Sequence, residues 1–183
     1  MNKLELRKIY LGKRAEFNGR KEADEKIFQK LVDACSNFSS VFTYINFKDE
    51  VNTTCFIKNM LDNGKRIFVP VCNTENCTMQ AVEISSLNDL KPNKYGILEP
   101  ETEFFVNKIK FDAVIFPGAV FDINGNRIGY GKGYYDKFIS SLEYTTKKIG
   151  ICYDFQLLHS IPNDKHDIKM DSIITDTRTV NII

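Results

Sequence analysis

Short, continuously apolar segments alternate with segments of helical periodicity along this chain, and this alternation most constrains its fold. The most apolar segment, residues 111–116 (FDAVIF), is followed at once by Pro117-Gly118. Residues 41–45 (VFTYI) and 148–153 (KIGICY) have the same β-branched and aromatic character. A strand with apolar residues on both of its faces must be covered on both sides, which is typical of the parallel sheets of α/β proteins.

Amphipathic helices are predicted between these strands. Residues 22–38 place Ile27, Leu31 and Phe38 on one stripe of a helix, and residues 3–17 predict a helix with a basic face. A third helix is expected from Thr53 or Thr54 to residue 61, before a left-handed turn at Asn63-Gly64. Further strands are expected at 66–71, 79–84, 172–175 and 179–183, a helix at 134–142, and a loop at 90–101.

The succession of strand, helix and strand with short connections predicts right-handed parallel crossovers. No repeat or linker divides the chain, so we expect a single domain over residues 1–183. The predicted fold class is α/β, with a mostly parallel central sheet and helices on both faces.

The charges of the chain are balanced, with 25 Lys and Arg against 24 Asp and Glu. This balance argues against a nucleic-acid surface, so any basic site must be local. No segment is long and apolar enough to span a membrane, and the start of the chain is no signal sequence, so we expect a cytoplasmic protein. The five cysteines form no CxxC pair and are expected to be reduced thiols.

Residues 117–138 (PGAVFDINGNRIGYGKGYYDKF) contain five of the ten glycines, together with Arg127 and Lys132. Glycine lets backbone N–H groups converge on an oxyanion, and a helix that begins near Tyr134 would direct its positive end to the same place. The segment therefore indicates a polyphosphate site, although its spacing alone also fits an ordinary surface loop.

Two familiar phosphate motifs do not match this segment. A Walker loop requires glycine at position 126 and Ser or Thr at position 133, where this chain has Asn126 and Gly133. The Rossmann pattern fails because the glycines run G-x-G-x-G and do not directly follow the strand. Asp136 is either a magnesium ligand beside the phosphates or an acid placed favourably at a helix start; Asp164, Asp167 and Asp171 are candidates for a second metal ligand.

With these residues in view, the sequence resembles the 5-formyltetrahydrofolate cyclo-ligase family, also called 5,10-methenyltetrahydrofolate synthetases. Segment 117–138 matches the family pattern PG-x-x-FD-x-x-G-x-R-x-G-x-GKGYYD. Supporting matches cover nearly the whole chain: Lys3 with Leu6-Arg7, Asp49-Glu50-Val51 with Thr53, Pro70, Tyr95-Gly96-Ile97 with Glu99-Pro100, Pro162 with Asp167, and residues 171–175.

The resemblance implies a fold of the NagB/RpiA/CoA-transferase-like kind and an ATP- and Mg²⁺-dependent conversion of 5-formyltetrahydrofolate to 5,10-methenyltetrahydrofolate. In this reaction the formyl oxygen is phosphorylated, N10 attacks the activated carbon, and ADP and phosphate are released. The expected partner is this small molecule, with or without a polyglutamate tail. The chain is expected to be a monomer that binds neither nucleic acid nor membrane.

The resemblance also implies roles for individual residues. It gives the catalytic roles to Lys132, Arg127 and Tyr134, and the magnesium ligands are Asp136 and Asp167. Residues implied to bind ATP are Lys3, Leu4, Glu5, Leu6, Arg7, Arg127, Ile128, Gly129, Tyr130, Gly131, Lys132, Gly133, Tyr134 and Tyr135. Those implied to bind the folate are Ile45, Glu50, Tyr130, Gly131, Lys132, Gly133 and Tyr134.

Two alternatives belong to other functional classes. The first is a binding module for a nucleotide or folate that has lost turnover, which the joint presence of Lys132, Arg127, Glu50 and Asp136 disfavours. The second is a sugar-phosphate isomerase or an acyl-CoA enzyme of similar sheet topology, for which the sequence has no obvious pair of catalytic acids or thioester site.

Overall fold

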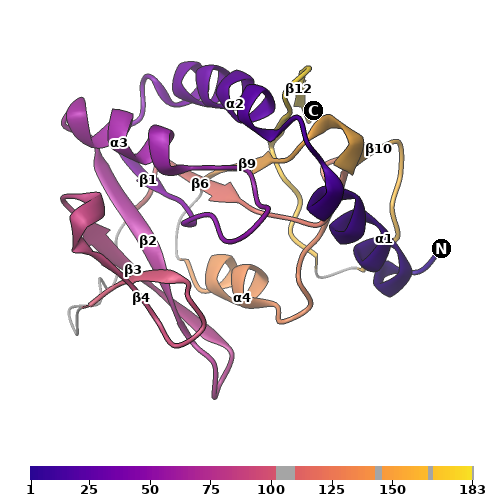
Figure 1. The fold of residues 1–183 in the computed structure, drawn as a ribbon. Helices are drawn as coiled ribbons and strands as arrows, with labels where there is room; N and C mark the ends of the chain where they lie inside the picture. The colour runs from indigo at the N-terminus through magenta and orange to yellow at the C-terminus, as the bar shows by residue number, and fades with distance from the viewer. Residues whose placement is uncertain (102–109, 143–145, 165–166, 183) are drawn as a thin grey trace.

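The computed structural model describes residues 1–101, 110–142, 146–164 and 167–182 of the chain. Within these ranges the central sheet has seven strands in the order β12-β11-β9-β6-β1-β2-β3 (Figure 1). The inner strands pair in parallel, whereas the edge strands β3 and β12 run antiparallel to their neighbours. The strands are β1 Ser40–Phe42, β2 Arg66–Asn73, β3 Thr78–Ile84, β6 Ala113–Phe116, β9 Lys147–Ile151, β11 Ser172–Ile174 and β12 Thr179–Asn181.

Helices cover both faces of this sheet, which confirms the predicted fold class. Helices α2 and α3 lie on one face and α4 on the other, while α1 lies beside the end of the sheet (Figure 1). The helices are α1 Lys3–Glu16, α2 Arg20–Cys35, α3 Thr54–Asp62 and α4 Tyr134–Ser140, with short 3₁₀ turns at Leu87–Asp89 and Asp154–Gln156. No helix in the described ranges is long and apolar enough to cross a bilayer.

Alternate strand residues bury their side chains in two different cores. In β6, Ile115 packs beneath α2 and α3, whereas Val114 and Phe116 pack in the aromatic core beneath α4. In β1, Val41 and Phe42 divide in the same way, and both are fully buried. Both faces of these strands are buried in a core, which explains why their sequences are continuously apolar.

The structure differs from the predicted elements in three places. Strand β1 ends at Phe42 and does not reach residue 45. The segment predicted as a loop at 90–101 contains an antiparallel pair, β4 Leu90–Pro92 and β5 Leu98–Pro100, because Asn93 and Gly96 form the turn between them. The glycine-rich segment contains β7 Val120–Asp122 and β8 Arg127–Ile128, which form a small sheet with β10 Leu157–Leu158.

Helix α1 packs on this small sheet. Leu6 and Tyr10 on α1 share a buried cluster with Val120, Ile128 and Ile161. This contact brings the basic N-terminal helix next to the glycine-rich segment, although more than one hundred residues separate them in the sequence.

Candidate active site

A cavity of about 420 Å³ lies where α1, the β2–β3 hairpin and residues 127–136 meet. Residues from seven separate parts of the chain line it, including nearly all of the residues to which the family resemblance gave a role. Those lining residues are Lys3, Arg7, Ile45, Glu50, Arg127, Ile128, Gly129, Tyr130, Gly131, Lys132, Gly133, Tyr134, Tyr135, Asp136 and Asp167. The fold therefore brings the candidate nucleotide, folate and metal residues into one place.

Three residues implied to bind ATP lie outside this cavity. Leu4 is 69% exposed, Leu6 is buried against the small sheet, and the Glu5 carboxylate accepts a hydrogen bond from the Asn2 backbone N–H at the start of α1. Helical geometry explains this placement, because Lys3 and Arg7 are four residues apart and share one face, while the residues between them point elsewhere.

The buried carboxylate of Asp122 shapes the hairpin that leads into the site. It accepts four hydrogen bonds: from the backbone N–H groups of Asn124, Asn126 and Ile161, and from the Asn126 side-chain amide, at 2.9–3.0 Å. The hairpin turns at Gly125, which has a φ of +85°, and a Cβ there would lie 2.8 Å from the Met170 carbonyl oxygen. This arrangement fixes where β8, and with it Arg127, begins.

We expect Asp122→Asn to lower the free energy of unfolding by about 3 kcal/mol, because an amide would face N–H donors that a carboxylate now satisfies. Denaturant titration measures this change. Asp62→Asn is the matched control, since Asp62 is exposed and forms an ion pair with the exposed Lys58, and it should cost less than about 0.5 kcal/mol. An equal, small effect of both variants would contradict this role for Asp122.

The loop that follows β8 is held against α1. The Arg7 side chain donates a hydrogen bond from Nε to the Gly129 carbonyl oxygen at 2.7 Å. Gly131 has a φ of +94°, which L-amino acids with a side chain rarely adopt, and a Cβ there would lie 3.3 Å from the Arg7 guanidinium. Glycine thus allows a cation to approach the loop backbone closely.

Arg127 is buried at the centre of the site and is 9% exposed. Its guanidinium pairs with Asp136 at 3.2 Å and donates to the Pro117 carbonyl oxygen at 3.2 Å. The guanidinium carbon also lies 5.4 Å from the centre of the Phe116 ring and 5.6 Å from that of Tyr135. Its Nε is a buried donor with no partner among the residues that the structure describes.

A second ion pair joins the start of α1 to the acidic segment near the C-terminus. The Lys3 ammonium donates to Asp164 at 2.7 Å and to Asp167 at 2.5 Å. Although partial burial acts in the opposite direction for both groups, these hydrogen bonds raise the pKa of Lys3 and lower the pKa of Asp167. Asp167 is therefore ionised at neutral pH. Asp171 pairs with Lys148 and is not among the residues that line the cavity.

Two further cations face the cavity without a carboxylate partner. Lys132 is exposed and has no hydrogen-bond or ion-pair partner in the described part of the chain, and the Arg7 side chain contacts only a neutral carbonyl. Because Lys3 and Arg127 are already paired with acids, Lys132 and Arg7 supply the positive charge that remains. The loop of residues 129–133 is thus suited to bind an anion.

The donor set can hold Mg²⁺ only together with an anionic ligand. The described residues contain no cluster of three or more His, Cys, Asp or Glu side chains of the kind that binds a metal alone. Asp136 and Asp167 both line the cavity, and Mg²⁺ at phosphate sites commonly uses one or two carboxylates with water and phosphate oxygens. The two carboxylates fit that pattern.

Another part of the lining is apolar and carries one carboxylate. Ile45, Met79 and Ile97 contribute apolar surface, and Tyr134 contributes an aromatic ring. Glu50 accepts a hydrogen bond from the Phe47 backbone N–H at 2.8 Å and another from the Tyr130 hydroxyl. Burial raises the pKa of Glu50, while these hydrogen bonds act in the opposite direction. This surface suits a flat heterocycle with N–H donors.

Sequence reasoning missed several lining residues, which are Tyr44, Phe47, Cys72, Met79 and Pro117. Cys72 lies on β2 and Met79 on β3, whereas the other three lie in segments that follow β1 and β6. These residues carry no charge, and only the tertiary fold shows that they reach the cavity.

Comparisons with known proteins match this chain to one family. Residues 2–176 match the model of the 5-formyltetrahydrofolate cyclo-ligase family. A 5-formyltetrahydrofolate cyclo-ligase of Mycoplasma genitalium is 32% identical over 179 residues, which cover 95% of this chain and 98% of the relative. A 5,10-methenyltetrahydrofolate synthetase structure from Aquifex aeolicus has a TM-score of 0.85 at 30% identity, covering 100% of this chain and 93% of that one. A second synthetase structure, from Mycoplasma pneumoniae, has a TM-score of 0.77 at 26% identity, covering 96% and 99%.

Proposed function

Because the chain belongs to the 5-formyltetrahydrofolate cyclo-ligase family, we propose that it converts 5-formyltetrahydrofolate to 5,10-methenyltetrahydrofolate with consumption of MgATP. One observation carries the proposal: a single cavity is lined by cations without carboxylate partners at a glycine-rich loop and by an apolar surface that holds Glu50. Each part suits one of the two substrates. We also propose that the chain works as a monomer.

The chemistry explains why ATP is needed. An amide oxygen is a poor leaving group, so the formyl oxygen must first be phosphorylated; N10 then attacks the activated carbon, and phosphate leaves. Catalysis of such a transfer consists mainly of positioning the reactants and stabilising charge on the transferring phosphoryl group. Lys132 and Arg127 would stabilise this charge, together with Arg7 of α1, which contacts the loop at Gly129. Tyr134 offers its ring to stack on the folate.

Bound Mg²⁺ would neutralise part of the phosphate charge, and Asp136 and Asp167 would hold it. Both carboxylates already lie beside cations, so the ion pairs with Arg127 and Lys3 hold them in place. The pairing of Asp136 with Arg127 also supports the alternative that it only orients Arg127.

The effect of Asp136→Asn separates these two roles. If Asp136 holds the metal, we expect the Mg²⁺ concentration for half-maximal activity to rise about tenfold, the loss typical when a metal site is weakened. Initial rates over a Mg²⁺ series measure this. Asp33→Asn, on the exposed face of α2, is the control and should leave the series unchanged. Full activity of Asp136→Asn at limiting Mg²⁺ would rule out the metal role.

A direct assay tests the proposed function. The purified protein is mixed with 5-formyltetrahydrofolate and MgATP, and the absorbance of the methenyl product is followed. We expect product only when ATP is present. No product with ATP, or equal product without it, would overturn the proposal. Binding of both ligands without product would instead identify a non-catalytic binding module.

A further inference from the structure

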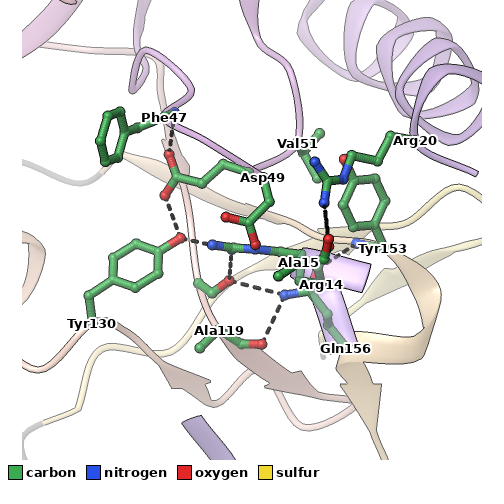
Figure 2. Close-up of polar contacts among 12 residues, drawn as sticks. Arg14, Ala15, Arg20, Phe47, Asp49, Val51, Ala119, Tyr130, Tyr153 and Gln156 are labelled. Atoms are coloured by element: carbon green, nitrogen blue, oxygen red, sulfur yellow. Dashed lines mark hydrogen bonds and ion pairs between the residues drawn. The ribbon is translucent and has the colours of Figure 1, made fainter. Parts of the chain in front are cut away.

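The side chain of Arg14 on α1 is almost fully buried and joins three segments around the site (Figure 2). Its Nε donates to Asp49 at 3.0 Å, and its Nη1 donates to the Gly118 carbonyl oxygen at 3.2 Å and to the Tyr130 hydroxyl at 3.0 Å. Arg14 itself is not among the residues that line the cavity. It therefore connects the end of β6, the turn at residues 47–50 and the glycine-rich loop without lining the cavity itself.

The charge of Arg14 is already balanced, so it does not serve as an anion site. Although burial acts in the opposite direction, the hydrogen bond and positive charge of Arg14 hold the pKa of the Asp49 carboxyl below its usual range. The pair is thus ionised at neutral pH. Its remaining hydrogen bonds go to the neutral oxygens of Gly118 and Tyr130, which indicates a role in placing other groups.

The direction of these hydrogen bonds is fixed by chemistry. A guanidinium can only donate, so the Tyr130 oxygen must accept from Arg14 and is left with one hydrogen of its own to donate. That hydrogen goes to the Glu50 carboxylate. Arg14 thus holds the Tyr130 hydroxyl in the orientation in which it donates to Glu50 (Figure 2).

Glu50 is consequently held at both of its oxygens. One accepts from Tyr130 and the other from the Phe47 backbone N–H. Two fixed donors leave the carboxylate one orientation in the cavity, with its remaining lone pairs available to a ligand.

From this geometry we propose that Arg14 is a positioning residue for the folate, acting through Tyr130 on Glu50. The proposal rests on the proposed function, since it assigns the substrate that Glu50 receives. Lysine cannot replace Arg14 in this role, because an ammonium lacks the planar fork that reaches Asp49, Gly118 and Tyr130 together. The effect should fall on binding of the folate in the ground and transition states alike, and so on KM.

Three variants test this: Arg14→Lys, Tyr130→Phe and the double variant. We expect each single variant to raise the KM for 5-formyltetrahydrofolate about tenfold, with kcat changed much less. The double variant should also show about a tenfold rise, since both changes break the same chain of hydrogen bonds. Tyr130→Phe removes one hydroxyl from a residue that is 41% exposed, so it keeps the test valid if Arg14→Lys fails to fold.

Arg20→Lys is the matched control. Among the residues that the structure describes, Arg20 donates only to the backbone carbonyls of Arg14 and Ala15 at the end of α1, so its substitution should lower stability but leave KM unchanged. Any of three results would overturn the proposal. They are a rise in KM for Arg20→Lys equal to that for Arg14→Lys, a hundredfold rise in KM for the double variant, and an unchanged KM for Tyr130→Phe. Calorimetric titration with 5-formyltetrahydrofolate in the absence of ATP repeats the comparison as Kd. A wild-type chain that binds this folate but makes no product would defeat the proposed function and leave the Arg14 test standing, whereas a wild-type chain that does not bind it would defeat both.

Discussion

Lys132→Ala is expected to lower kcat by about 10²–10³, the usual cost of removing one donor that stabilises charge in a transition state. The side chain is exposed and has no partner within the described ranges, so no contact is lost in the free protein. We therefore expect the melting temperature to stay within about 1 °C of the wild type. Steady-state kinetics and thermal unfolding of the same preparation measure the two effects.

Lys137→Ala is the matched control for this substitution. Lys137 lies five residues further along, is also exposed, and does not line the cavity. It should retain full turnover, since the same charge is removed at a place where no phosphate binds. Wild-type kinetics in Lys132→Ala would show that turnover does not need this lysine. An equal loss in both variants would show that general charge, and not the position of Lys132 in the loop, matters.

Arg127→Met should reduce both activity and stability. The substitution removes a buried cation that pairs with Asp136, bonds Pro117 and lies over two aromatic rings. We expect kcat to fall by about 10²–10³. We expect the free energy of unfolding to fall by about 2 kcal/mol, a moderate loss because the Asp136 side chain is 36% exposed and water replaces part of the pairing.

The double variant Arg127→Met with Asp136→Asn separates the two effects. Neutralising Asp136 removes the unpaired carboxylate, so part of the stability should return while turnover stays low. Denaturant titration and kinetics of the three proteins measure this. A single Arg127→Met variant as stable as the wild type would contradict the structural role of this ion pair.

The fold could be predicted from the sequence where the local hydrophobic pattern of a segment agrees with its burial in the tertiary structure. Residues 111–116 and 148–153 read as strands buried on both faces, and Val114 and Ile115 indeed enter opposite cores. The antiparallel pair β4–β5 was missed because a strand of three residues next to prolines has no periodicity to detect. The single domain over residues 1–183 and the NagB/RpiA-like topology stay predictions.

The part of the candidate site that could be predicted is the part whose sequence motif combines charged residues with glycines. Residues 127–136 and the pair Lys3 and Arg7 meet in the cavity as the family resemblance implies. Leu4 and Leu6 do not, since a helix turns them away. The role of Arg14 depends on partners 35 or more residues away, and Asp122 also accepts a hydrogen bond from Ile161, which is 39 residues away. No local pattern in one sequence reveals such distant partners.

The formyl oxygen itself offers the most direct test of the central claim, that this cavity transfers a phosphoryl group from ATP to the folate. 5-Formyltetrahydrofolate labelled with ¹⁸O in the formyl group is converted with unlabelled MgATP, and the released phosphate is analysed by mass spectrometry. If the formyl oxygen is phosphorylated and then leaves with the phosphate, each phosphate released with a methenyl product carries one ¹⁸O. Methenyl product accompanied by unlabelled phosphate would contradict the account.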